Sequence, residues 1–167
     1  VHRDLKPANV MVDARGRARL LGFGIARLLD GEDAQAEARD RALTPAFAAP
    51  EQLAGEAITT RTDVYALGAL LYWLLTGRTP HETENLPLAA LVARVCGSDP
   101  LPPSAAGRGI DRDLDAIALM ALERDPARRY PSADALRADL ERWQRGDVVA
   151  ARVPTRAERM RRWIRAH

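Results

Sequence analysis

The stretch VHRDLKPANVMVDARGRARLLGFG, residues 1–24, decides how the rest of the chain is interpreted. Asp4 supplies a carboxylate that can accept a proton from an attacking hydroxyl group. Lys6 can neutralise phosphate charge, and Asn9 offers an amide oxygen, a hard ligand that suits Mg²⁺. These three residue types within one short segment indicate a site for phosphoryl transfer.

A short β-hairpin is predicted directly after this cluster. Residues 10–12 and 18–21 have strand-like composition, and the sequence Asp-Ala-Arg-Gly at 13–16 is typical of a turn. An antiparallel hairpin would bring Gly22-Phe23-Gly24 back beside the loop that contains Asp4. We therefore expect one loop and one strand end to converge on a single point, as a preorganised site requires.

The pattern His2-Arg3-Asp4-Leu5, followed by Asn9, fits the signature H-R-D-L-x-x-x-N, and in it the chain resembles the protein kinases. With a lysine two residues after this aspartate, Lys6, the pattern resembles that of serine/threonine kinases rather than that of tyrosine kinases. The resemblance covers residues 1–145 and implies a mainly α fold, the large lobe of a bacterial serine/threonine kinase with a small β-hairpin. The elements that precede this loop in the family, including the small lobe, are expected to be absent.

The resemblance also implies roles for individual residues. Asp4 would be the catalytic base, Lys6 the phosphate-neutralising cation and Asn9 a magnesium ligand, with Thr44 as a brace between Asp4 and Lys6. Two further residues, expected to support the loop, are His2 and Arg3. The implied cofactors are ATP and Mg²⁺, and the implied substrate is a protein with a serine or threonine hydroxyl.

One position departs from the family pattern. Where the family has Asp-Phe-Gly, this chain has Gly22-Phe23-Gly24, and the spacing from Asp4 is 22 − 4 = 18 residues, as in the family. Phe23 and Gly24 are expected to keep the backbone turn, but the metal-binding carboxylate is missing at Gly22. Because the small lobe that builds most of the adenine pocket is also expected to be absent, we expect weak or absent binding of ATP and Mg²⁺ and no independent catalysis by this chain.

Later landmarks follow in the family's order. Ala49-Pro50-Glu51 matches the A-P-E signature, and Arg129 resembles the arginine that pairs with its glutamate. Asp63 resembles the aspartate that grips the backbone of the catalytic loop. A nearly all-apolar helix over 64–75, capped by Thr62-Asp63 and closed by Gly77, is predicted to be buried. Three further helices are predicted, over 87–95, 114–122 and 133–145, the last capped by Ser132.

Composition limits the remaining function classes. The formal net charge is only +2, from 25 basic and 23 acidic residues, which gives no case for nucleic-acid binding. The single cysteine fits a reducing cytoplasm and excludes an internal disulfide. No apolar run approaches the length of a transmembrane helix.

Residues 146–167 form a basic C-terminal tail with a different character. Between 152 and 167 the sequence has six arginines and one glutamate. One interpretation is a solvated helix end. The other is a juxtamembrane segment that contacts an anionic membrane surface, since basic residues concentrate on the cytoplasmic side of membrane spans.

Three functional hypotheses stay open from the sequence. The first is a serine/threonine protein kinase whose catalysis is lost or weakened in this chain. The second is a pseudokinase or docking module, which Gly22 favours and the retained Asp4, Lys6 and Asn9 oppose. The third is a remnant of a longer or interrupted gene with no function alone, since the family's preceding helices are missing from the sequence.

Overall fold

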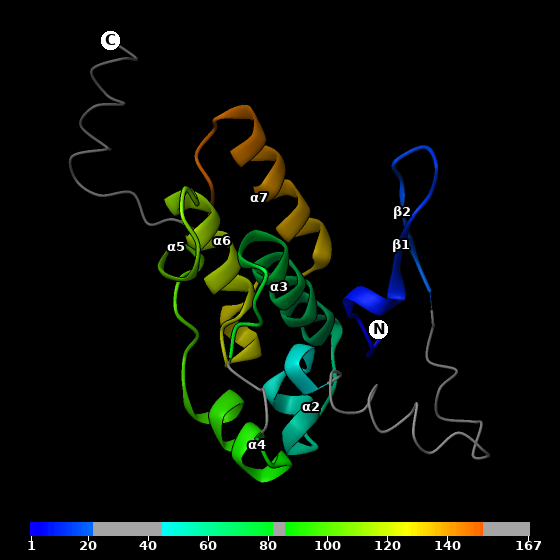
Figure 1. Cartoon of the computed structure of the whole chain (residues 1–167), viewed down its shortest axis with the longest axis vertical. Helices are drawn as coiled ribbons and strands as arrows, with labels where there is room; N and C mark the ends of the chain where they lie inside the picture. The colour runs from blue at the N-terminus through cyan, green and yellow to red at the C-terminus, as the bar shows by residue number, and fades with distance from the viewer. Residues whose placement is uncertain (22–44, 82–85, 152–167) are drawn as a thin grey trace.

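The structure, a computed structural model, describes residues 1–21, 45–81 and 86–151 (Figure 1). Within them it is mostly helical, with one antiparallel sheet of two strands, so the expected fold class is confirmed. The elements in chain order are η1 Pro7–Asn9, β1 Val10–Val12, β2 Ala18–Leu20, η3 Pro45–Phe47, α2 Pro50–Ala54, α3 Thr60–Thr76, α4 Leu88–Gly97, α5 Pro103–Ala106, α6 Arg112–Ala121, η4 Pro126–Arg128 and α7 Ala133–Arg145.

Helix α3 is the central element of the helical body (Figure 1). It contacts α5, α6, α7 and η3, and a buried apolar cluster lies on each of two sides of it. The first cluster includes Phe47, Tyr65 and Tyr72, and the second includes Val64 and Ile117. The predicted burial of this helix is correct for its first part, where Val64, Tyr65 and Ala69 are buried, and wrong near its end, where Trp73 and Leu74 are exposed.

The start of α3 differs from the prediction. The helix begins at Thr60, and its cap is Thr59 rather than Thr62-Asp63. The Thr59 side chain accepts a hydrogen bond from the Arg61 amide, while the Thr62 hydroxyl accepts one from the Thr59 amide. This reciprocal arrangement satisfies amides that the helix itself cannot, which explains the earlier start. Gly77 ends the helix with φ of 70°, as predicted.

The other helices lie close to their predicted positions. Helix α4 runs two residues beyond its predicted end, and α6 begins two residues earlier because Asp111 caps it. Ser132 caps α7 as predicted. A short helix that was not among the predicted ones, α5, begins at Pro103, where proline at the first position needs no amide partner. No helix in the described part of the chain is long and apolar enough to cross a membrane.

The hairpin lies at the edge of the helical body (Figure 1). Val10 pairs with Leu20 and Val12 with Ala18. In the turn, the Asp13 carboxylate accepts hydrogen bonds from the Arg15 and Arg17 amides, at 2.9 and 3.0 Å. The Leu21 amide donates to the Asn9 carbonyl at 2.8 Å, which extends the pairing to the start of β1. The hairpin therefore brings Leu21 back beside the segment that contains Asp4 and Asn9, whereas the expected position of Gly22-Phe23-Gly24 lies outside the described residues.

Candidate functional site

The site begins with the loop over residues 2–6, whose backbone is held from α3. The Asp63 carboxylate accepts hydrogen bonds from the amides of His2, at 2.8 Å, and Arg3, at 3.0 Å. Arg3 has φ of 71°, a left-handed conformation that is uncommon outside glycine. The first turn of the central helix thus fixes an unusual backbone shape immediately before Asp4.

A second contact comes from α2. The Gln52 Nε2 atom donates to the Arg3 carbonyl at 2.9 Å, and its Oε1 atom accepts from the Ala49 amide at 3.1 Å. The Arg3 backbone is therefore bonded on its N–H side by Asp63 and on its C=O side by Gln52.

Asp4, Lys6 and Asn9 form a polar cluster. The Asn9 Nδ2 atom donates to the Asp4 carbonyl oxygen at 2.7 Å and to Asp4 Oδ2 at 2.8 Å. The Lys6 ammonium lies 3.5 Å from the same Oδ2 atom. Both bonds use the amide nitrogen of Asn9, so its oxygen, Oδ1, is the atom that can ligate a cation.

The His2 ring connects this loop to the end of the hairpin. The ring is buried; its Nε2 atom lies 3.0 Å from the Leu21 carbonyl, and its Nδ1 atom lies 3.4 Å from the Asp4 amide. These partners assign the proton to Nε2, because a carbonyl can only accept and an amide N–H can only donate. Leu21, the residue that precedes position 22, is thereby fixed beside Asn9 and His2.

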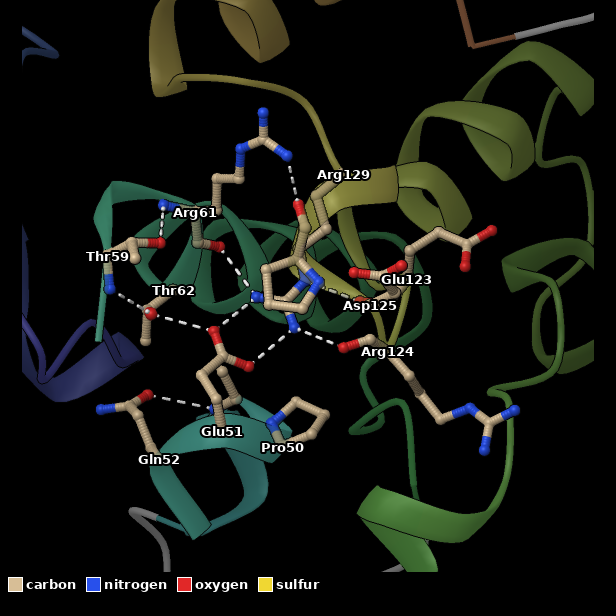
Figure 2. Close-up of polar contacts among 12 residues, drawn as sticks. Pro50, Glu51, Gln52, Thr59, Arg61, Thr62, Glu123, Arg124, Asp125 and Arg129 are labelled. Atoms are coloured by element: carbon tan, nitrogen blue, oxygen red, sulfur yellow. Dashed lines mark hydrogen bonds and ion pairs between the residues drawn. The ribbon is translucent and has the colours of Figure 1, made fainter. Parts of the chain in front are cut away.

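A second, buried cluster joins α2 to the segment before α7 (Figure 2). Glu51 and Arg129 form two parallel bonds, Nη1 to Oε1 and Nη2 to Oε2, each of 2.7 Å. The Thr62 hydroxyl donates to Glu51 Oε1 at 2.9 Å. The Arg129 guanidinium also lies 5.0 Å from the centre of the Tyr65 ring, within the range of a cation–π contact.

The remaining donors of Arg129 are bonded to backbone carbonyls. They contact the carbonyl oxygens of Glu123, Arg61 and Arg124 at 2.6, 3.0 and 3.0 Å. Burial alone would raise the pKa of Glu51, but the hydrogen bonds and charge of Arg129 hold that pKa below its ordinary value. Both members of the pair are thus charged and almost completely removed from solvent.

The structure brings most of the predicted site residues into two groups. The first contains the catalytic-loop residues and their support: His2, Arg3, Asp4, Lys6, Asn9 and Asp63. The second contains Glu51 and Arg129. The predicted site residues at four further positions lie outside the described residues: Gly22, Phe23, Gly24 and Thr44.

Two residues of these clusters were missed by the sequence reasoning: Gln52 and Thr62. Each is the third residue of a helix, and a polar side chain at that position is a signal for a capping box. That signal predicts a bond to the helix N-terminus. It does not reveal the second bond of each side chain, to Arg3 and to Glu51, because those partners are distant in sequence.

The possible metal ligands in the cluster of Asp4, Lys6 and Asn9 suit a hard cation such as Mg²⁺ only in part. The Asn9 amide oxygen is a fitting ligand, but the residues that the structure describes contain no group of three or more histidine, cysteine or acidic side chains arranged to hold a metal ion. A cation bound here would depend on ligands from phosphate groups and water.

Comparisons with known proteins agree with this arrangement. The protein kinase domain family matches residues 1–139. Serine/threonine-protein kinase PknB of Mycobacterium tuberculosis is 40% identical over 161 residues, which cover 95% of this chain and 25% of the relative. The probable serine/threonine-protein kinase SCO3848 of Streptomyces coelicolor is 40% identical over 153 residues, 90% of this chain and 22% of the relative. The chain thus spans about a quarter of the length of these relatives.

Proposed function

The chain belongs to the protein kinase family, with bacterial serine/threonine kinases among its relatives, and from this premise we propose that its site serves phosphoryl transfer from ATP to a protein hydroxyl. The observation that carries the proposal is the position of the Asp4 carboxylate, bonded to Asn9 and beside Lys6 on a loop held from α3. A carboxylate fixed in this way can orient a serine or threonine hydroxyl and accept its proton.

Each neighbour of Asp4 has a separate role in the proposal. The Asn9 amide nitrogen fixes the Asp4 side chain, while its Oδ1 atom is the ligand offered to Mg²⁺. Lys6 neutralises charge on the phosphoryl group and partly offsets that of Asp4. When bound, Mg²⁺ would neutralise phosphate charge, which is the main electrostatic requirement of such reactions.

The second candidate function is a docking module that keeps the fold and does not catalyse. Gly22 favours it, because a glycine offers no side-chain ligand where the family has a carboxylate. Under this alternative the loop contacts from Asp63 and Gln52 would preserve only a protein-binding shape.

Three partners complete the proposal. We propose a small lobe, supplied with or joined to this chain, as the source of most of the ATP pocket, and a protein with an exposed serine or threonine as the substrate. The arginines between 152 and 167 are proposed to contact an anionic membrane surface from the cytoplasm. The folded part of the chain extends past residue 145, where the sequence had placed its end, because Val149 is buried and the Ala150 and Ala151 amides donate to Asp139.

A fusion of this chain to the small lobe and the further helices that precede the corresponding loop in the mycobacterial relative tests the function. In a fusion that carries Gly22→Asp, we expect transfer of labelled phosphate from ATP to a generic protein substrate. Adding Asp4→Asn should abolish the transfer, while adding Asp147→Asn, an exposed aspartate paired with Arg145, should leave it unchanged. A correctly folded Gly22→Asp fusion without transfer would overturn the proposal and favour the docking module.

A further inference from the structure

We propose that Gln52 is a positioning residue, which holds the peptide bond between Arg3 and Asp4 and thereby sets the direction of the Asp4 carboxylate. The inference rests on the proposed function of Asp4, whereas the hydrogen bonds of Gln52 that support it are independent of that function. It assigns to the third residue of α2 a role beyond that of a helix cap.

The Gln52 side-chain amide accepts one hydrogen bond and donates another. Its oxygen accepts from the Ala49 amide, and its nitrogen donates to the Arg3 carbonyl 49 positions away in sequence. The first bond orients the side-chain amide, so that its nitrogen faces the loop. Of the common polar side chains of this length, only glutamine accepts and donates at once, since glutamate at neutral pH can only accept.

The bond from Gln52 to the Arg3 carbonyl acts on the peptide unit that leads directly into Asp4. The Arg3 carbonyl and the Asp4 nitrogen belong to one planar peptide unit, so fixing the carbonyl also fixes the start of Asp4. Arg3 lies in the left-handed region, with φ of 71°, and Asp63 holds only its N–H side. Without Gln52, this peptide unit keeps only the longer bond from the Asp4 amide to His2 Nδ1, at 3.4 Å, so it is freer to rotate and to carry the Asp4 side chain with it.

Amide hydrogen exchange of the 167-residue chain, measured by NMR, tests the inference without any need for catalysis. The Gln52→Glu variant keeps the acceptor for the Ala49 amide but loses the donor to Arg3. We expect the His2 and Arg3 amides, which donate to Asp63, to exchange roughly 2- to 10-fold faster, the effect of one ordinary hydrogen bond. The Leu53 amide inside α2 should keep its wild-type rate.

The matched control is Gln144→Glu, the same change at an exposed position of α7, which should not alter exchange at His2 or Arg3. If Gln52→Glu does not fold, Gln52→Met removes the donor without adding charge and gives the same comparison for the loop. Unchanged exchange at His2 and Arg3 overturns the inference. An equal acceleration at Leu53 also overturns it, because Gln52 would then act only as a cap.

The kinetics of phosphoryl transfer by the Gly22→Asp fusion provide a second test of the role of Gln52. Gln52→Glu is expected to lower kcat with little change in KM for ATP, since it displaces the base and not the nucleotide site. If that fusion transfers no phosphate, the proposed function fails, whereas faster exchange at His2 and Arg3 would still assign Gln52 its hold on the loop. If Gln52→Glu leaves both the exchange at His2 and Arg3 and kcat at their wild-type values, the positioning role of Gln52 is rejected, and the proposed function is unaffected.

Discussion

At the scale of single residues, Glu51 and Arg129 form an ion pair that is almost completely removed from solvent. Both side chains are buried, and each charge depends on the other for compensation. Arg129→Ala leaves the Glu51 carboxylate without its partner, so we predict a loss of about 3–5 kcal/mol in the free energy of unfolding. Urea denaturation measures this loss.

Arg137→Ala is the matched control for that substitution. Arg137 also contacts two carboxylates, Asp134 and Glu141, but all three side chains are well exposed on α7. Exposed pairs contribute at most about 1 kcal/mol, so this variant should be nearly as stable as the wild type. Equal losses in the two variants would contradict the importance of burial.

The residue scale also shows what a sequence can reveal about the site. Asp4, Lys6 and Asn9 were predictable because their spacing on one loop is itself a signature. The positive φ of Arg3 and the bond from Gln52 were not, because they depend on how α2 and α3 pack against the loop. Local sequence carries no signal for a contact between distant elements.

At the scale of elements, the crossing of α3 and α6 depends on Gly68. A Cβ atom built there would lie 2.6 Å from the Ala121 Cβ atom and 3.3 Å from the Ala121 carbonyl carbon. Since backbone cannot move aside easily, Gly68→Ala is predicted to destabilise the protein by about 1–3 kcal/mol in urea denaturation.

The same substitution at Gly97 is the control for Gly68→Ala. Gly97 is the last residue of α4, and a Cβ atom there would meet nothing within 4 Å. Gly97→Ala should therefore be neutral or slightly stabilising, because alanine loses less conformational entropy in a helix. Equal stability of the two variants would show that α3 and α6 can separate without cost.

Asp139 ties the end of the described chain back onto α7. Its buried carboxylate accepts bonds from the Tyr130 hydroxyl at 2.7 Å and from the amides of Ala150 and Ala151, at 2.5 and 2.9 Å. Burial raises the pKa of Asp139, but the Ala150 amide and the other donors together hold that pKa below its usual value. The charged form is therefore favoured by folding.

This arrangement predicts a dependence of stability on pH. A carboxyl whose pKa is lower in the folded state stabilises the protein above its unfolded pKa, about 3.9, and loses that contribution as pH falls through the folded value. Asp139→Asn should cost about 1–3 kcal/mol at pH 7, since each carboxylate oxygen accepts from two donors and one of these oxygens becomes an NH2 group that cannot accept. Chemical denaturation should show a smaller difference from wild type near pH 3, and a constant difference would contradict the role of the charge.

At the scale of the whole molecule, the helical architecture was predictable from sequence patterns, whereas the ends of the helices were predicted less accurately. The burial of α3 was predictable for most of its length because the helix is mainly apolar, but the exposure of Trp73 and Leu74 was not. Its first residue was misplaced because the choice between Thr59 and Thr62 as cap depends on which hydroxyl faces which amide. The return of residues 149–151 onto Asp139 was likewise invisible, because it joins a loop to a distant helical face.

We propose that the molecule retains the catalytic loop of a kinase and lacks one metal ligand, at Gly22. The most direct measurement is the rate of phosphoryl transfer by the small-lobe fusion with and without Gly22→Asp. Restoring one preorganised electrostatic element should raise the rate by at least about 100-fold, because such elements typically contribute 100- to 1000-fold. Equal rates for the two fusions would contradict the claim, since another group would then supply the missing ligand.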